Sequence, residues 1–304
     1  MLPADHDFSL VNELNILLIA CWVLLGLAPV IFFSLVCAAA SPYGRHVLKN
    51  EKEPSEKEEQ VDSVAPLNST SEEVSATAAN NSGRMLLITK KTLPARTAWV
   101  LQESPAFYVA FLCFYLSGKR GNITSSATNV LLWLFLVHYI QRSFIYPLFI
   151  RGGKPFPVST FLMAFQFCVM NGYLQGRYLA LTKPYPDSWF RDPRFVIGVL
   201  IFLIGMGINL HSDHVLRNLR KPGETGYKIP HGGMFRWLSA PNLFGEVVEW
   251  SGFAIANWSW PTFTFAVLTA ANLVPRAIQH HAWYRKRFGD EYPAERRAFI
   301  PGVF

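Results

Sequence analysis

The sequence contains few charged residues and few cysteines for its length. Asp, Glu, Lys and Arg together make up 16% of the 304 residues, whereas an ordinary soluble domain has about 25%. The cysteines, Cys21, Cys37, Cys113 and Cys168, each lie in an apolar run, and no two of them form a Cys-x-x-Cys pair. This pattern excludes a disulfide scaffold and provides neither a zinc site nor a redox pair.

Apolar residues are abundant instead. They make up 51% of the chain, and aromatic residues alone make up 14%. These values exclude a disordered chain and a coiled coil, and they indicate a membrane protein with several spans. The net charge of +7 would suggest nucleic acid as the partner of a soluble protein. Because cytoplasmic loops of membrane proteins are rich in Lys and Arg, we expect no nucleic-acid partner here.

Seven apolar runs predict transmembrane helices. A helix needs about 20 mostly apolar residues to cross a bilayer. The runs cover residues 14–40, 99–117, 127–150, 158–181, 195–210, 243–257 and 261–278. We therefore predict an all-α fold in which residues 1–304 form a single polytopic membrane domain in the lipid bilayer. Gly172 and Gly176 have the spacing that lets helices pack closely, and we expect that contact within one chain and a monomeric protein.

The distribution of basic residues predicts the orientation of these helices. No Lys or Arg precedes Arg45, so the N-terminus is expected on the external side and the C-terminus, after seven spans, in the cytoplasm. Most of the 28 Lys and Arg residues then fall in cytoplasmic loops. The pattern fits the endoplasmic reticulum membrane and a bacterial inner membrane equally well.

Residues 49–83 differ from the rest of the chain because they are acidic, rich in Ser, Thr and Asn, and almost free of aromatic residues. Such a segment cannot bury enough apolar surface to order itself. We predict a disordered cytoplasmic insert. Its role is open between a passive linker and a segment that binds a partner.

Polar residues interrupt the second and third predicted spans. Gln102 and Glu103 lie a turn inside the second span, where a carboxylic acid is expected to be neutral or to have a partner. An interfacial Glu stabilised by the helix dipole is an equally good interpretation. His138, Tyr139 and Arg142 lie in the third span. Tyr and His are common at membrane interfaces, but the added Arg suggests a nearby carboxylate or other anion.

The largest polar cluster extends from residue 205 to 233. Asn209, Asp213 and Arg220 recur at helical spacing, so they are expected on roughly one face of a helix that ends at the Lys-Pro-Gly run 221–223. Arg217, Arg220 and Lys221 could hold phosphates, and Asp213 could bind a ribose or an amide. An ordinary basic loop would explain the Arg and Lys residues but not Asn209 and Asp213.

The last two predicted spans carry two further polar stripes. Asn242, Glu246 and Glu249 share one helical face, and their carboxylates need cations or donors. Arg276, His280 and Tyr284 recur every four residues and could face inward toward the same ligand. His280 and His281 could suggest a metal, but adjacent residues on a helix point about 100° apart. We therefore predict no metal site. The run GMGINL also lacks the glycine pattern of a soluble dinucleotide-binding domain.

Together these segments resemble the steroid 5α-reductases, or 3-oxo-5α-steroid 4-dehydrogenases. The resemblance covers residues 43–304 apart from the insert, and it rests on LPARTAWVLQESPAF, VHYIQRSFIYPL, GMGINLHSDHVLRNLRKPGETGYKIPHGGMF, APNLFGEVVEWSGFAIANWSWP and HHAWYRKRFGDEYPAERRAFIPGVF. It implies a seven-helix bundle that binds NADPH from the cytoplasm. It also implies reduction of the Δ4 C=C bond of 3-oxo-Δ4 steroids to 5α-reduced 3-oxo steroids.

The resemblance also implies roles for individual residues. Glu103 and Tyr139 are expected as catalytic residues that bind the steroid 3-ketone. Gln102, Arg142 and Trp250 are expected to line the substrate pocket. The expected cofactor-binding residues are Asn209, Asp213, Arg220, Asn242, Glu246, Arg276, His280 and Tyr284.

The expected mechanism follows from the chemistry of enones. A hydride adds to the β-carbon of an enone once the carbonyl is polarised, because negative charge then develops on the oxygen. Protonated Glu103 and Tyr139 would donate hydrogen bonds to that oxygen, and the hydride would go to C5. The residues do not identify the proton donor to C4 or the physiological steroid. A related membrane reductase that acts on another lipid enone or an enoyl thioester is the main alternative, and a transporter or a methyltransferase would bind no NADPH.

Overall fold

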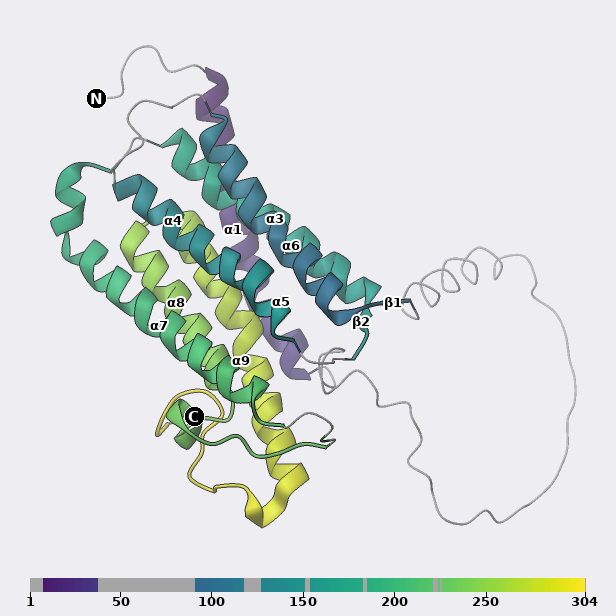
Figure 1. The fold of residues 1–304 in the computed structure, drawn as a ribbon. Coiled ribbons are helices and arrows are strands. Elements are labelled where there is room, and N and C mark those ends of the chain that lie inside the picture. The colour runs from purple at the N-terminus through teal and green to yellow at the C-terminus, as the bar shows by residue number, and fades with distance from the viewer. Residues whose placement is uncertain are drawn as a thin grey trace, which may run out of the picture.

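The computed structural model describes residues 8–37, 91–117, 127–150, 154–182, 185–220, 224 and 226–303. They form an elongated bundle of long helices that run roughly along one direction (Figure 1). The long helices are α1 (Phe8–Cys37), α3 (Ala95–Tyr115), α4 (Ala127–Ile140), α6 (Val158–Leu181), α7 (Pro193–Arg217), α8 (Pro241–Asn257) and α9 (Trp260–Phe288). The predicted all-α class is confirmed. The predicted insert, residues 49–83, lies outside the described residues.

Short elements connect these helices. The strands β1 (Thr92–Leu93) and β2 (Phe156–Pro157) pair antiparallel at the starts of α3 and α6. A π-helix, η2 (Gln141–Ile145), follows α4 directly and continues into α5 (Tyr146–Leu148). Three 3-10 turns, η3 (Asp187–Arg191), η4 (Gly233–Arg236) and η5 (Gly289–Glu291), complete the described elements.

Each predicted apolar run overlaps a helix, but several helices extend past it. α7 continues from the predicted end at residue 210 to Arg217, and α9 continues from residue 278 to Phe288. α7 nevertheless stops before the Lys-Pro-Gly run because Asn218 caps it, with its backbone and side-chain N–H groups both donating to the His214 carbonyl. Arg220 therefore lies beyond the helix rather than on its face.

Among the described helices, two satisfy the length and composition expected of a membrane-crossing helix, Val11–Val36 of α1 and Pro193–Arg217 of α7. Both present large apolar side chains outward. Exposed examples are Ile16, Trp22 and Phe33 on α1 and Ile197, Leu200 and Ile204 on α7.

Glycines bring α7 and α8 into close contact. A Cβ atom added to Gly205 would overlap the backbone nitrogen of Glu249, and one added to Gly252 would overlap that of Phe202. At Gly245 the added Cβ would lie 2.6 Å from the backbone nitrogen of Asn209. Because no larger residue fits in this seam, the two helices run almost backbone to backbone. The polar residues that follow on α7 are thereby held against the start of α8.

A second glycine contact joins α6 to α3. A Cβ atom at Gly172 would lie 2.8 Å from the Ala106 carbonyl oxygen, and one at Gly176 would meet the backbone of Ala110. The Gly-x-x-x-Gly spacing thus packs helices within this chain, as the sequence suggested. This contact brings the Gln102–Glu103 segment of α3 close to α6.

The main core is aromatic and lies inside the bundle. Trp250 of α8 is 1% exposed, and its ring centroid lies 4.4 Å from that of Phe265 and 5.8 Å from that of Phe135. Tyr139 is also in this cluster, with its ring centroid 6.0 Å from that of Trp250. A polar hydroxyl is therefore held at the edge of a large apolar region, which is a good environment for a hydrophobic ligand with one polar end.

Candidate active site

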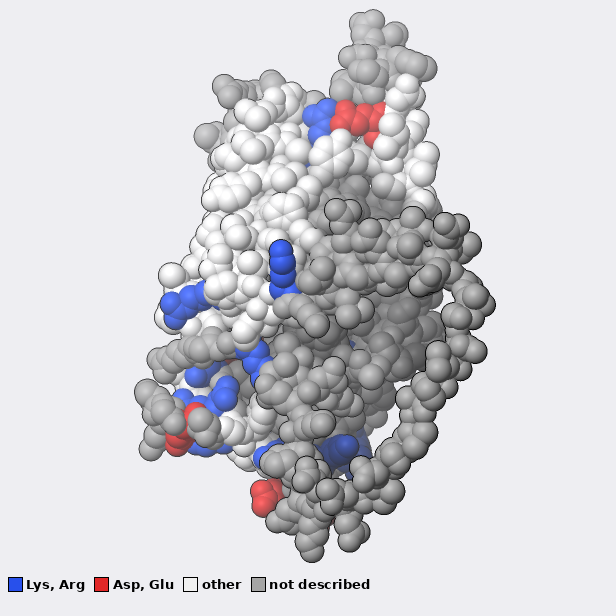
Figure 2. Space-filling view, turned by 90° about the vertical axis from the view of Figure 1, so that its right-hand side faces the viewer, with Lys and Arg blue, Asp and Glu red and all other residues white. Residues whose placement is uncertain are grey.

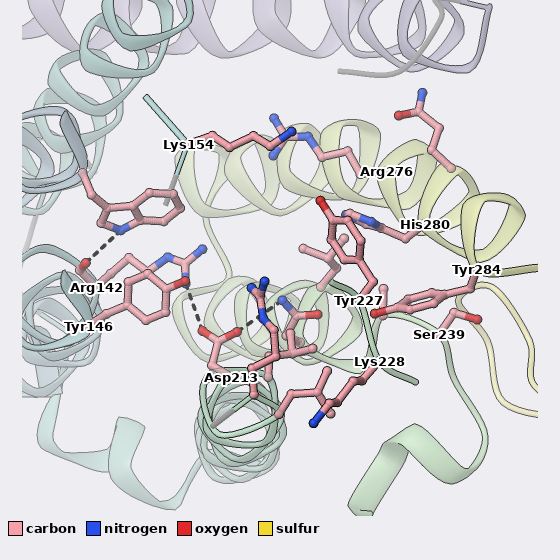
Figure 3. Close-up of a pocket in the computed structure, with 18 of the residues that line it drawn as sticks. Arg142, Tyr146, Lys154, Asp213, Tyr227, Lys228, Ser239, Arg276, His280 and Tyr284 are labelled. Atoms are coloured by element: carbon pink, nitrogen blue, oxygen red, sulfur yellow. Dashed lines mark hydrogen bonds and ion pairs between the residues drawn. The ribbon is translucent and has the colours of Figure 1, made fainter. Parts of the chain in front are cut away.

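A cavity of about 740 Å³ opens at the end of the bundle that contains the C-terminal halves of α7 and α9 (Figure 3). Its walls come from α3, the π-helix and α5, α7, α8 and α9, together with parts of the loops at residues 154–155, 227–228 and 239–240. The volume is within the range of small-molecule and cofactor sites.

The polar stripe of α9 lines this cavity. Arg276, His280 and Tyr284 all contribute to its wall, and Figure 3 shows them side by side along the helix. This is the inward-facing arrangement that their four-residue spacing suggested. Tyr284 also stacks on Tyr292 of the C-terminal segment, with ring centroids 5.3 Å apart and an interplanar angle of 6°. The C-terminal segment thereby supports the cavity wall.

Asp213 is the centre of a polar group on the opposite wall. Its carboxylate is 5% exposed, and its Oδ2 atom accepts a hydrogen bond from Arg142 Nη1 at 3.3 Å. Its Oδ1 atom accepts one from Asn242 Nδ2, also at 3.3 Å. Arg142 also lies near Glu246, with Nη2 3.6 Å from Oε2. The π-helix, α7 and α8 are thus joined by one guanidinium and two carboxylates.

Asn209 and Glu246 do not line the cavity. Asn209 is buried and donates from Nδ2 to the backbone carbonyl of Asn242 at 3.0 Å. Asn209 therefore positions the start of α8, whereas Asn242, which does line the cavity, presents its side chain to Asp213. Of the expected cofactor-binding residues, Asp213, Arg220, Asn242, Arg276, His280 and Tyr284 border the cavity.

Two aromatic rings clamp the Arg142 side chain. The guanidinium carbon lies 4.9 Å from the ring centroid of Trp99 and 4.9 Å from that of Tyr146, which is the range of cation–π contacts. The Trp99 indole also donates to the Arg142 backbone carbonyl at 3.1 Å. This carbonyl lies in the π-helix, where the backbone hydrogen bonds follow a different pattern from those of an α-helix. The Trp99 indole gives this carbonyl a donor from outside the helix. Sequence reasoning did not single out Trp99 or Tyr146, although both lie in the segments that carry the resemblance.

Several cations lie around the cavity mouth. Lys154, Arg220 and Lys228 line it (Figure 3 labels Lys154 and Lys228), and they come from different loops. Arg220 Nη1 donates to the Gly226 carbonyl at 3.3 Å, and Lys228 pairs with Glu224. Lys154 and Lys228 were missed from the sequence because helical periodicity gives no information about where a loop side chain points.

Glu103, Tyr139, Gln102 and Trp250 lie deeper and do not line the cavity. The Glu103 carboxyl accepts from Gln102 Nε2 at 3.2 Å and from the Cys168 thiol at 3.7 Å. Tyr139 is 4% exposed, and its hydroxyl accepts from Asn171 at 3.2 Å. Arg142 follows Tyr139 by one turn and does border the cavity, so it lies between the deep group and the outer one.

The buried carboxylate of Glu249 is paired through one of its two oxygens. Its Oε1 atom lies 2.7 Å from His138 Nδ1, and both side chains are almost completely buried. His138 and Arg142 therefore face Glu249 and Glu246 respectively, so two basic side chains of one helix oppose two carboxylates of α8. Within the described residues, no group of three or more His, Cys, Asp and Glu side chains could hold a metal ion.

A short hydrogen-bond relay holds the wall near Tyr284. The Tyr292 hydroxyl donates to Ser239 Oγ at 2.7 Å, and Ser239 Oγ lies 2.6 Å from His281 Nδ1. Ser239 accepts from Tyr292, so its own hydroxyl proton can be donated, and the Nδ1 atom of a neutral His281 can accept it. Burial lowers the pKa of His281, with smaller contributions from the nearby charges of Arg285 and Arg297. This shift favours the neutral form of the His281 ring, in which Nδ1 can accept from Ser239.

Known proteins match the chain over most of this architecture. Residues 154–304 match the family described as 3-oxo-5-alpha-steroid 4-dehydrogenase. The bovine 3-oxo-5-alpha-steroid 4-dehydrogenase 1 (Bos taurus) is 55% identical over 210 residues, which cover 69% of this chain and 81% of that protein. The human type 1 protein (Homo sapiens) is 50% identical over 212 residues, covering 70% and 81%. The human 3-oxo-5-alpha-steroid 4-dehydrogenase 2 is 47% identical over 212 residues, covering 70% and 82%.

The helical bundle thus contains a deep polar group beneath an open, cation-rich cavity. Its sequence is extensively identical to members of one enzyme class, the oxidoreductases that act on CH–CH groups. The chain belongs to the 3-oxo-5-alpha-steroid 4-dehydrogenase family, the steroid 5α-reductases.

Proposed function

We propose that the protein reduces the Δ4 C=C bond of a 3-oxo-Δ4 steroid with NADPH and forms the 5α-reduced 3-oxo steroid. The observation that carries the proposal is the pair of adjoining sites. The outer cavity has the charges that a dinucleotide needs, and the Tyr139 hydroxyl lies in an aromatic core behind it. The relatives named above support the substrate class through their names.

The residues of the outer cavity fit NADPH chemically. Arg220, Lys154 and Lys228 offer positive charge at the mouth, where phosphate groups would be neutralised. Asp213 and Asn242 offer an acceptor and an amide for hydroxyl and carboxamide groups, and Tyr284 offers an aromatic face. Arg276, His280, Asn209 and Glu246 would act in the same binding region, the last two by holding α8 and Arg142. When bound, NADPH supplies the hydride equivalent for C5 of the steroid.

The protein's own part in the reaction is to polarise the enone and exclude water. The hydroxyl of Tyr139 and the protonated carboxyl of Glu103 donate hydrogen bonds to the steroid 3-oxygen, where negative charge develops in the transition state. Gln102, Arg142 and Trp250 shape the surrounding pocket. The aromatic cluster around Trp250 keeps this region apolar, so each donor acts in a medium of low dielectric constant.

We propose that the seven predicted apolar runs, the last of them residues 261–278, cross an endoplasmic reticulum membrane or a bacterial inner membrane, with the N-terminus external and the C-terminus cytoplasmic. Figure 2 supports a membrane contact because most of the Lys and Arg residues in view lie at mid-height and below, and uncharged surface extends above them as far as one group of charged residues near the top. The cavity would then open toward the cytoplasm, where NADPH is available. The protein would function as a monomer with the steroid as its substrate.

The test is the conversion of a 3-oxo-Δ4 steroid by purified protein with NADPH, with product analysis. We expect the 5α-reduced ketone from the wild type, and at least about a tenfold lower kcat from Tyr139→Phe and from Glu103→Gln. The first substitution removes a donor to the developing charge, and the second replaces an acidic O–H donor by a weaker amide N–H donor. An enoyl thioester and a non-steroid enone in the same panel test the substrate class. Wild-type turnover of those compounds alone would contradict the steroid assignment, and full activity in both variants would contradict the residue roles.

A further inference from the structure

A chain of buried amides leads from a backbone carbonyl to the Tyr139 hydroxyl. Gln175 Nε2 donates to the carbonyl oxygen of Pro261 at 3.0 Å and to Asn171 Oδ1 at 3.2 Å. Asn171 Nδ2 then donates to the Tyr139 hydroxyl oxygen at 3.2 Å. Asn171 and Gln175 are each 2% exposed and lie one turn apart on α6. The network therefore connects α9, α6 and α4 in the interior of the bundle.

The Pro261 carbonyl fixes the direction of every hydrogen bond in this chain. A carbonyl oxygen can only accept, so the Gln175 atom that faces it must be the NH₂ group. The second hydrogen of the same NH₂ group points to Asn171, so the Asn171 atom that faces Gln175 must be the oxygen. The Asn171 NH₂ group is thereby turned to Tyr139, whose oxygen must accept. Reversing any amide would place two donors or two acceptors in contact, at a cost typical of an unsatisfied buried polar group.

Tyr139 is consequently left with a hydroxyl proton that is free to be donated. Within the described part of the chain, no acceptor for that proton is found. The Glu103 carboxyl lies on the neighbouring helix α3 and is already contacted by Gln102 and Cys168. A ligand oxygen that enters this region thus meets a tyrosine whose lone pair is occupied and whose proton is available.

We infer that Asn171 and Gln175 are positioning residues that hold Tyr139 as a hydrogen-bond donor to the ketone oxygen of the substrate. This inference rests on the proposed function, because it takes the 3-ketone as the acceptor. Asn171 acts directly on the Tyr139 hydroxyl, and Gln175 acts only by fixing the orientation of the Asn171 amide. The two residues need not touch the substrate.

The order of the chain predicts a nested set of mutational effects. Asn171→Leu is expected to lower kcat about tenfold with little change in KM. The substitution removes the hydrogen bond from Asn171 to the Tyr139 hydroxyl, so this hydroxyl is less well oriented toward the ketone oxygen in the transition state. Gln175→Leu should lower kcat by a smaller factor, since Asn171 is still present but free to turn over. Gln175→Leu should have no further effect once Asn171 is Leu, and Asn171→Leu should have no further effect once Tyr139 is Phe. Gln166→Leu, which changes an exposed amide of the same helix, is the matched control and should leave kcat unchanged.

A binding measurement provides a second readout that does not depend on turnover. A 3-oxo-Δ4 steroid and its 3-deoxo analogue are titrated while tryptophan fluorescence is recorded. The wild type is expected to prefer the ketone. Tyr139→Phe should remove that preference, and Asn171→Leu should reduce it.

These outcomes separate the inference from the function on which it rests. Suppose that the wild type is active and that Tyr139→Phe lowers its kcat. If Asn171→Leu then leaves kcat unchanged, or lowers it by the same factor whether or not Tyr139 is present, the positioning role alone is overturned. Equal affinity of the wild type for ketone and deoxo analogue would overturn the placement of the ketone at Tyr139. A wild type that neither binds nor reduces the steroid would overturn the proposed function and this inference together. If Asn171→Leu reduces the thermal stability of the protein, Gln175→Leu, which is one hydrogen bond further from Tyr139, carries the test.

Discussion

The Arg142 guanidinium and the Asp213 carboxylate lie 3.3 Å apart and join the π-helix to the last turns of α7. Trp99 and Tyr146 hold the guanidinium from both sides, so the direction of Arg142 is set before any ligand binds. Asp213 is fixed in turn by Asn242. A site prepared in this way loses little conformational entropy on binding, which is the usual basis of high affinity for a charged cofactor.

Asp213→Asn tests this arrangement at the cofactor. The substitution keeps the shape of the side chain but removes the charge opposite Arg142 and one acceptor in the cavity. We expect the affinity for NADPH to fall by about tenfold to a hundredfold, as for the loss of a hydrogen bond to a charged group. Titration of NADPH followed by calorimetry gives the measurement. Asp187→Asn in the exposed turn η3 is the control, and equal losses in both variants would count against a specific role for Asp213.

Arg220→Gln and Lys228→Gln test the cations at the cavity mouth. Each is expected to weaken NADPH binding by about threefold to tenfold, because a charge-assisted contact to a phosphate is lost. The loss should shrink as the salt concentration rises, since these groups are solvent-exposed and screened. Arg236→Gln removes an exposed cation that does not line the cavity and should leave the affinity unchanged. A salt-independent loss in all three variants would argue for a change in fold instead.

Gly205→Ala tests the seam between α7 and α8. The added methyl group would overlap the Glu249 backbone, and overpacking of this kind costs about 1–3 kcal/mol. We expect a clear fall in the thermal midpoint of the detergent-solubilised protein. Gly207→Ala is a matched control two residues away, because nothing lies within 4 Å of its added Cβ. This control should stabilise the helix by up to about 1 kcal/mol, and the same loss at both positions would refute the close-packing argument.

The relay through Ser239 predicts a pH dependence of stability. His281 lies beyond the expected span 261–278, and burial lowers its pKa in the folded protein. The unfolded chain, with a His pKa near about 6.5, then binds more protons than the folded one as the pH falls below that value. His281 therefore favours the folded state fully above about pH 6.5 and progressively less below it.

The measurement is the thermal midpoint of wild type and His281→Gln between pH 7.5 and pH 5, two conditions that bracket about pH 6.5. The wild type should lose more stability toward low pH than the variant, whose amide does not titrate. His214→Gln, which changes an exposed histidine on α7, should follow the wild type. Parallel curves for wild type and His281→Gln would contradict the assignment of a neutral His281.

Helical periodicity predicted the parts of the fold that depend on it. The apolar runs located the long helices, and the four-residue spacing of Arg276, His280 and Tyr284 predicted the stripe of α9 that faces the cavity. Spacing also placed Glu246 and Glu249 on one face, and both have basic neighbours in the structure. These predictions succeed because a regular helix converts sequence separation directly into direction.

Other parts of the site could not be predicted because they depend on long-range packing. Lys154 and Lys228 approach the cavity from loops, and Ser239 meets His281 only because the C-terminal segment folds back beside it. Asn171 and Gln175 read as ordinary residues of an apolar span, since nothing in their spacing shows which hydroxyl they face. Arg220 was placed on a helical face, yet α7 ends earlier at the Asn218 cap.

The π-helix makes the site sensitive to chain length as well as to residue type. A π-turn holds one more residue than an α-turn over the same rise, so η2 shifts the phase between Tyr139 before it and Tyr146 after it. If Gln141–Ile145 formed a regular α-turn without losing a residue, the residues that follow would be rotated by about 100° relative to those before it. Tyr146 would then leave the face of Arg142 although no side chain of the clamp had been replaced. The one extra residue of the π-turn thus sets the direction of Tyr146, at the outer cavity, relative to Tyr139 in the core.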